Sequence, residues 1–262
     1  MNDLNRVFTP NHTATSATMR VVVAVQAALA LAIWFVAPFQ VLPTPPEVFR
    51  ALGTLWMEQG LGQELITSFV MNLEALAWTV AISLGLCYCT VMPFFRPLAA
   101  AVAKGRFLGL IGLTFVFTLV VGGGHNLKVS LLVFGMTVFF VTSMAAEIEA
   151  IPKSKFDHAR TLRMSEWRVV LEVVVLGTAD KAIEVLRQNA AIGWMMLTMV
   201  EGISRAEGGV GAMLLNQNKH FHLAEVFAIQ LVILFVGLGQ DYAIGLLKRF
   251  ACPYAELSLE RK

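Results

Sequence analysis

The residues best suited to recognition are concentrated in one polar stretch, 148–187, which lies between apolar segments. Phe156, Ala159 and Leu162 recur every three residues and would share one side of a helix. Trp167 follows a few residues later. The basic residues of the stretch are Lys153, Lys155, Arg160, Arg163, Arg168, Lys181 and Arg187. So short a segment cannot bury these apolar side chains in a core of its own, so we expect a partner protein to cover them.

Two short helices are predicted inside this stretch. Ser154 and Asp157 have the spacing of a capping box, in which the serine oxygen accepts from a backbone amide and the acidic side chain returns the bond. Ser165 followed by Glu166 favours a second helix start, because an acidic residue in the first turn complements the helix dipole. Gly177 is predicted to end that second helix.

Other residues could carry chemistry outside this stretch. Glu74 is a carboxylate within an apolar run, where a charge marks either a substrate contact or a structural ion pair. His220 and His222 form at most a partial metal site, so no metal is expected. Lys128 follows three glycines but lacks the glycine directly before the lysine that a phosphate loop requires. We therefore expect this chain to bind no ATP and no cofactor.

The elements that must position these residues are membrane spans. Of the 262 residues, 57% are hydrophobic and only 15% are charged, with a mean hydropathy of +0.69. Long apolar runs of this kind are typical of a membrane protein and exclude an ordinary soluble domain. A net charge of +2 gives no reason to expect a nucleic-acid partner. The three cysteines imply no disulfide framework.

The expected fold is all-α: a polytopic membrane protein with about six transmembrane helices. The predicted spans are residues 21–39, 65–94, 107–121, 127–146, 183–203 and 223–247. Residues 1–18 are predicted to be an N-terminal tail, 19–250 a transmembrane domain with the central loop 147–182, and 251–262 a C-terminal tail.

The distribution of basic residues predicts the orientation of these spans. With the N-terminus inside, 16 of the 20 Lys and Arg residues fall on the inner side, including Arg96, Lys104 and Arg106 between the second and third spans. The outer side keeps Arg50, Lys128, Arg205 and Lys219. Because basic residues are retained in the cytoplasm, both termini and the central loop are expected there. Asp241 in the last span is expected to pair with Lys248 or Arg249, and Arg187 to extend toward the interface.

The central loop resembles the cytoplasmic EAA loop of ABC importer permeases, in the branch that includes the nitrate, sulfonate and taurine permeases. Family members often read E-A-A-R-T-L-G-A-S-x-W, where this chain reads D-H-A-R-T-L-R-M-S-E-W from Asp157 to Trp167. The loop glycine is Arg163, and two expected prolines are Gly177 and Lys181, so the EAA loop is degenerate. Gly208, Gly209 and Gly211 resemble the family's G-L-G segment, and Asp241 matches a family aspartate.

The resemblance implies a type I ABC importer permease in the bacterial inner membrane, a transport subunit and not an enzyme. Its implied partners are ABC ATPase subunits that hold ATP and Mg, a second permease copy or a related permease, and an extracytoplasmic substrate-binding protein. The implied substrate is a small anion such as a sulfonate, taurine or nitrate. The residues expected to contact the ATPase are Phe156, Asp157, Ala159, Arg160, Leu162, Arg163 and Trp167. Those expected along the translocation pathway are Glu74, Gln188, Asn189, Met195 and Met199, with the methionines as a hydrophobic gate.

Two other functions stay open at this point. An intramembrane enzyme would need a nucleophile and a base at one depth. Ser83, Ser130 and Ser143 lie in predicted spans, but no histidine is predicted there to activate them. A non-transporting membrane scaffold is also compatible with the degenerate loop.

Overall fold

The computed structural model describes residues 15–36, 42–204 and 208–253, and every regular element in these ranges is helical. The α-helices are α2 (Ser16–Val36), α3 (Pro45–Met57), α4 (Leu61–Cys89), α5 (Arg96–Lys104), α6 (Leu110–Val121), α7 (His125–Glu149), α8 (Lys153–Thr161), α9 (Glu166–Val169), α10 (Ala179–Ile203), α11 (Val210–Lys219) and α12 (Leu223–Ala251). Short helical turns, η1 (Pro93–Phe95), η2 (Gly105–Phe107), η3 (Val170–Val175) and η4 (Leu176–Thr178), join some of them. The predicted all-α fold class is confirmed.

Four helices in the described part of the chain, α2, α4, α7 and α12, are long and apolar enough to cross a membrane. A bent pair, Pro93–Phe107 with Leu110–Val121, would make a fifth. The predicted third span is only the 12 residues of α6, about 18 Å at ~1.5 Å per residue, against ~30 Å of hydrocarbon. The predicted fifth span, 183–203, lies in α10, whose 25 residues are long enough but which is not among the helices apolar enough to cross a membrane.

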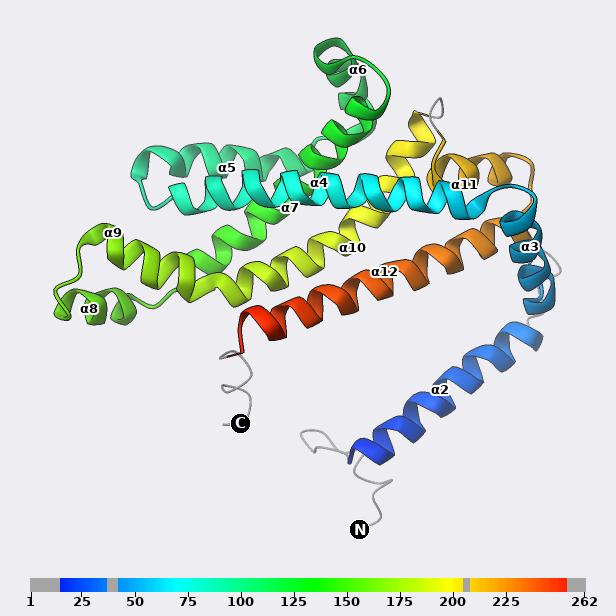
Figure 1. Cartoon of the computed structure of the whole chain (residues 1–262), viewed down its shortest axis with the longest axis horizontal. Coiled ribbons are helices and arrows are strands. Elements are labelled where there is room, and N and C mark those ends of the chain that lie inside the picture. The colour runs from blue at the N-terminus through cyan, green and yellow to red at the C-terminus, as the bar shows by residue number, and fades with distance from the viewer. Residues whose placement is uncertain (1–14, 37–41, 205–207, 254–262) are drawn as a thin grey trace.

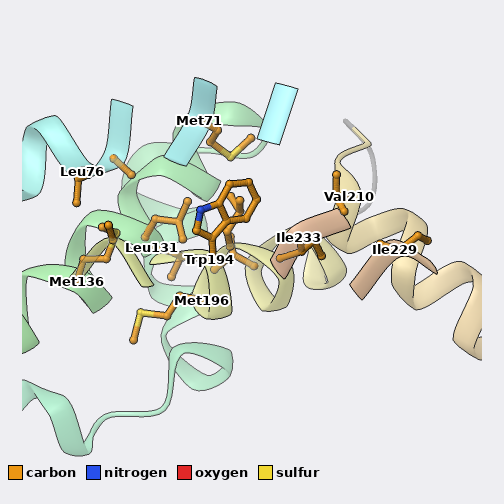
Figure 2. Close-up of a cluster of buried hydrophobic side chains, with 14 of the residues drawn as sticks. Met71, Leu76, Leu131, Met136, Trp194, Met196, Val210, Ile229 and Ile233 are labelled. Carbon is orange, nitrogen blue, oxygen red and sulfur yellow. The ribbon is translucent and has the colours of Figure 1, made fainter. Parts of the chain in front are cut away.

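The core of the bundle lies where α4, α7, α10 and α12 meet. Figure 2 shows Trp194 of α10 at its centre, with Met71 of α4 and Leu131 and Met136 of α7 close by. The helices approach closely at small residues: a Cβ on Gly193 would lie 2.7 Å from Oδ1 of Asn72. Membrane helices associate through close packing of this kind at small residues, because lipid supplies no hydrophobic driving force between them.

The two ends of the bundle differ in structure. Figure 1 shows α8 and α9 at one end, near the last residues of α12, with α3 and α11 at the other. Helix α2 leads into α3, at the end of the bundle opposite α8 and α9. Helix α2 stands apart from the bundle, since none of its most apolar window is buried. It is tied near its end by Trp34, whose Nε1 donates to the Pro43 carbonyl at 3.1 Å.

The central loop is helical with different boundaries from those predicted. The capping box of Ser154 and Asp157 is wrong, because α8 already begins at Lys153 after an extended Pro152, with no side-chain cap bond. Proline fixes this entry by its own φ, which leaves Ser154 inside the first turn. Ser165 does precede α9 as its N-cap residue. Gly177 does not end a helix, because π and 3-10 turns lead directly from α9 into α10.

Candidate functional site

The predicted ATPase-contact residues divide into a buried and an exposed set. Ala159 of α8 is buried, and Phe156 is half-buried beside α5 and α7, where it lines a cavity of about 660 Å³. In contrast, Leu162 is 59% exposed and Trp167 is 70% exposed. The prediction that one side of α8 carries Phe156, Ala159 and Leu162 is therefore only partly right, because Leu162 lies past the end of the helix. The large apolar residues of this loop that are exposed and available to a partner are Leu162, Trp167, Leu171 and Leu176.

The turn between α8 and α9 is built around two arginines. Arg160 donates from Nε and Nη2 to the Glu166 carboxylate at 3.0 and 3.2 Å, and Nη1 lies 3.7 Å from Asp157 Oδ1. The hydrogen bond from Arg160 lowers the pKa of Glu166 below its ordinary value. Arg163 has a φ of 57°, in the left-handed region. This is the position of the family's loop glycine, and glycine adopts that φ without steric cost.

The predicted pathway residues do not form one site in the described structure. Oε2 of Glu74 lies 2.8 Å from Nε2 of His125. Of the two roles that the sequence left open for Glu74, this contact favours the structural pair. Gln188, Met195 and Met199 are all exposed and follow one face of α10. Asn189 is buried within the bundle. One face of α10 thus carries three of the five candidates.

A charged ladder joins α10 to α12 near the end that carries α8. Arg187 Nε and Nη2 each donate to Asp241, to Oδ1 and Oδ2, both at 2.6 Å. Lys248 donates to Glu184 at 2.7 Å. The expected pairing of Asp241 with Lys248 is therefore wrong, and Arg187 is a bidentate partner of a carboxylate. Helix α12 places Asp241 level with Arg187, and a forked guanidinium matches both carboxylate oxygens.

A second polar cluster, which we call the outer hub, fixes the start of α11. Ser68 of α4 donates to Glu201 Oε1 at 2.6 Å and accepts from the Val210 N–H at 2.9 Å. Glu201 Oε2 accepts from the Gly211 N–H at 2.8 Å. Ser68, Glu201 and Val210 are fully buried. These three hydrogen bonds join α4, α10 and α11, and the longest of them in sequence spans 142 residues.

Lys128 and Glu64 complete the outer hub. Lys128 was expected on the outer side, at the start of the fourth span; it lies in α7 and is fully buried, with Nζ 3.0 Å from the Gly208 carbonyl oxygen. Glu64 Oε2 accepts from the Gly209 N–H. Gly208 and Gly209 have φ of 71° and 105°, and a Cβ on either would meet a hub carboxylate. These glycines are needed for this turn, as their resemblance to the G-L-G segment implied.

A group of buried amides lies between the hub and the charged ladder, and sequence reasoning missed it. Gln240 Oε1 accepts from Trp194 Nε1 at 2.7 Å and from Asn72 Nδ2 at 3.1 Å. The only signal of this group in the sequence was that amide side chains occur within apolar runs predicted to be helical. Among the described residues, no group of three or more His, Cys, Asp or Glu side chains could hold a metal ion. His222 bonds Gln217 instead, at 2.9 Å.

Comparison with known proteins identifies the fold. No protein-family model and no curated protein matches the sequence. Among solved structures, the chain is similar to one in inward-facing conformations of the MetNI methionine ABC transporter, with a TM-score of 0.59 and 15% sequence identity. The match covers 75% of this chain and 97% of that chain. At this identity the likeness shows the fold alone: the chain shares the all-α fold of that transporter chain.

Proposed function

We propose that this chain is the transmembrane permease subunit of an ATP-driven importer that couples to a separate ATPase through residues 147–182. The observation that carries the proposal is the permease fold combined with the exposed α8–α9 segment at one end of the bundle. ATP and Mg would be held by the ATPase. Closure of two ATPases would move α8 and α9, and α10 continues from them almost without a break.

The exposed side chains of α8 and α9 support this coupling. Trp167, Leu162 and Leu171 are apolar and more than half exposed, on a segment rich in arginine and lysine. Aromatic side chains ringed by polar groups are common at the centres of protein interfaces. Phe156 is half-buried between α8 and the bundle, so it supports the contact by holding α8 in place.

The end of the bundle that carries α8 and α9 also supports a proposal for the orientation. The basic residues of the central loop lie where α8 and α9 project, toward the last residues of α12. The cytoplasmic retention of basic residues supports a bacterial inner-membrane protein with both termini inside. A cysteine at Ser154 should react with an impermeant reagent only after the cells are opened, and labelling in intact cells would contradict this orientation.

A second permease and a binding protein belong to the same proposal. The exposed face of α10 carries Gln188, Met195 and Met199, so a second copy or a related permease facing it would enclose a pathway between the two chains. The resemblance to the nitrate, sulfonate and taurine branch supports a small anion as substrate, delivered by an extracytoplasmic binding protein. The mass of the purified assembly tests the dimer, and one permease with one ATPase would contradict it.

The coupling is tested by comparing two exposed tryptophans at opposite ends of the bundle. Trp167→Ala removes an anchor of α9, whereas Trp56→Ala alters α3 at the other end. Truncating an aromatic anchor commonly costs about 2 kcal/mol or more. We therefore expect Trp167→Ala to weaken binding of a co-expressed ABC ATPase at least ~10-fold, which corresponds to about 1.4 kcal/mol. Trp56→Ala should leave that affinity unchanged.

Measurements of ATPase binding and of ATP-driven uptake also distinguish the permease from a membrane scaffold and from an intramembrane enzyme. A membrane scaffold would bind no ATPase and would support no ATP-driven uptake when reconstituted with one. An intramembrane enzyme would keep its activity when α9 is altered. Equal ATPase affinity in the Trp167→Ala variant and the unaltered chain would refute the assignment of α9 as the contact.

A further inference from the structure

A cavity of about 660 Å³ lies between α8, η3, α5 and α7. Five alanines of α5 and α7 form part of its lining, and Phe156 of α8 and Val174 of η3 also line it. Sites for small molecules and for parts of larger ligands measure about 300–1,000 Å³, so the volume is sufficient for a ligand. The segment that we assign to the ATPase contact therefore rests in part on a cavity and not on a packed core.

Two side chains of opposite charge line this cavity. Arg96 is the first residue of α5 and Glu149 is the last residue of α7, and both are exposed. Arg96 donates from Nε to the Thr90 carbonyl at 3.1 Å, which leaves its Nη groups available to a ligand. Within the described ranges, neither side chain forms an ion pair with the other or with a third residue. A cation and an anion beside apolar walls are complementary to a zwitterion that carries an apolar chain.

The cavity lies where two spanning helices end. Its lining includes Glu149, at the end of α7, and the two residues that directly follow α4. Phe94 and Leu98, two residues to either side of Arg96, are 82% and 50% exposed. An arginine among exposed apolar side chains at the end of a span is typical of the headgroup layer of a membrane. This position favours a lipid over a ligand that enters from water.

We propose that this cavity binds phosphatidylethanolamine, a lipid whose headgroup carries a phosphate and a primary ammonium. The phosphate accepts hydrogen bonds from Arg96, whose planar fork matches two phosphate oxygens, and the ammonium donates to the Glu149 carboxylate. The start of one acyl chain lies against the alanines, and the rest of the lipid stays in the bilayer. Phosphatidylglycerol lacks the ammonium, and the quaternary ammonium of phosphatidylcholine has no N–H to donate. The proposal rests on the proposed function for its side of the membrane, the inner leaflet, where the lipid would brace Phe156 and Val174 and so regulate coupling.

The test titrates the full chain in detergent with dioleoyl phosphatidylethanolamine, phosphatidylglycerol or phosphatidylcholine and counts bound lipids by native mass spectrometry. Phosphatidylethanolamine should bind first and most tightly. Glu149→Gln should weaken phosphatidylethanolamine at least ~10-fold and leave phosphatidylglycerol unchanged, because only the first lipid donates to this carboxylate. Arg96→Gln should weaken both lipids, since both carry the phosphate. Arg106→Gln and Glu147→Gln are the matched controls outside the lining and should bind normally.

A pair of neighbouring alanines gives a second, independent arm. Ala100 lines the cavity and is exposed, whereas Ala101 is exposed but lies outside this lining. Ala100→Phe should abolish tight binding of phosphatidylethanolamine, Ala101→Phe should preserve it, and both should keep the unfolding midpoint of the unaltered chain. Equal affinity for the three lipids, normal binding by Arg96→Gln, or equal loss in the two phenylalanine variants would overturn the proposal. So would displacement of the lipid by an equal concentration of glycerophosphoethanolamine, because the site would then recognise a soluble zwitterion.

The permease function fails or survives separately, because lipid binding is measured without an ATPase. A chain that binds an ATPase through Trp167 but shows no preference for phosphatidylethanolamine would overturn this site alone. A chain that binds the lipid through Arg96 and Glu149 but binds no ATPase would overturn the proposed function. Where both hold, ATP-driven uptake should be slower in liposomes that lack phosphatidylethanolamine, and the Arg96→Gln variant should not respond to that change. Equal responses of the variant and the unaltered chain would overturn the regulatory role.

Discussion

The outer hub predicts a large effect from the loss of a single oxygen atom. Ser68→Ala removes the hydroxyl that donates to Glu201 at 2.6 Å and accepts from the Val210 N–H at 2.9 Å. The change leaves a buried carboxylate with one fewer donor and a buried N–H without an acceptor. No apolar contact is lost, because alanine keeps the Cβ.

The magnitude follows from these two bonds. A hydrogen bond to a charged group contributes about 1.5–3 kcal/mol, and an orphaned buried donor costs about 1–3 kcal/mol. The two effects share one oxygen and are not additive, so we expect a loss of about 3 kcal/mol. For a chain of this size, about 1 kcal/mol shifts the unfolding midpoint by roughly 2–4 °C, so the expected fall is roughly 6–12 °C.

Ser83 provides a matched control on the same helix. It is also fully buried, but its hydroxyl has no hydrogen-bond partner among the residues that the structure describes. Ser83→Ala should therefore be neutral or slightly stabilising, since it removes a polar atom that gains nothing from burial. Thermal unfolding of both variants in one detergent measures the difference. Equal midpoints for the two variants would refute the account of the hub.

Three further predictions test other parts of the structure. Gly211→Ala should prevent folding of the α10–α11 turn, because its Cβ would meet the α10 backbone, whereas Gly239→Ala has open space and should be tolerated; expression and unfolding midpoints check both. Arg163→Gly should stabilise the α8–α9 turn by about 0.5–1 kcal/mol, since it relieves a φ of 57°, and slower proteolysis of the turn would show it. Asp241→Asn should lower thermal stability and Arg187→Gln in the same chain should restore part of it; a double variant worse than the sum of the single ones would contradict the pairing.

Much of the helical framework could be predicted from the sequence. The predicted spans 65–94, 127–146 and 223–247 correspond to α4, α7 and α12 with boundaries that differ by a few residues. Hydrophobic runs and the prolines and glycines between them are local signals, and helix formation is governed by bonds four residues apart. The third span failed because apolar content alone does not reveal that 93–121 bends at its centre.

The candidate sites were less predictable for a physical reason. Which residues pair depends on how each helix is rotated about its axis and where it crosses its neighbours. The composition of a single helix does not contain that information. Lys128 illustrates this, because the sequence places it on the outer side at the start of a span but does not reveal that it is buried against the Gly208 carbonyl.

The sequence by itself determined that this chain is helical, lies in a membrane and carries a basic loop between its fourth and fifth predicted spans, because these properties depend on composition and local order. Only the tertiary structure decided that Glu74 pairs with His125, that Asp241 pairs with Arg187, and that Gly105 lies beside Val138 of α7. Each of those results depends on contacts between helices far apart in the chain, and such contacts follow from packing of the whole bundle.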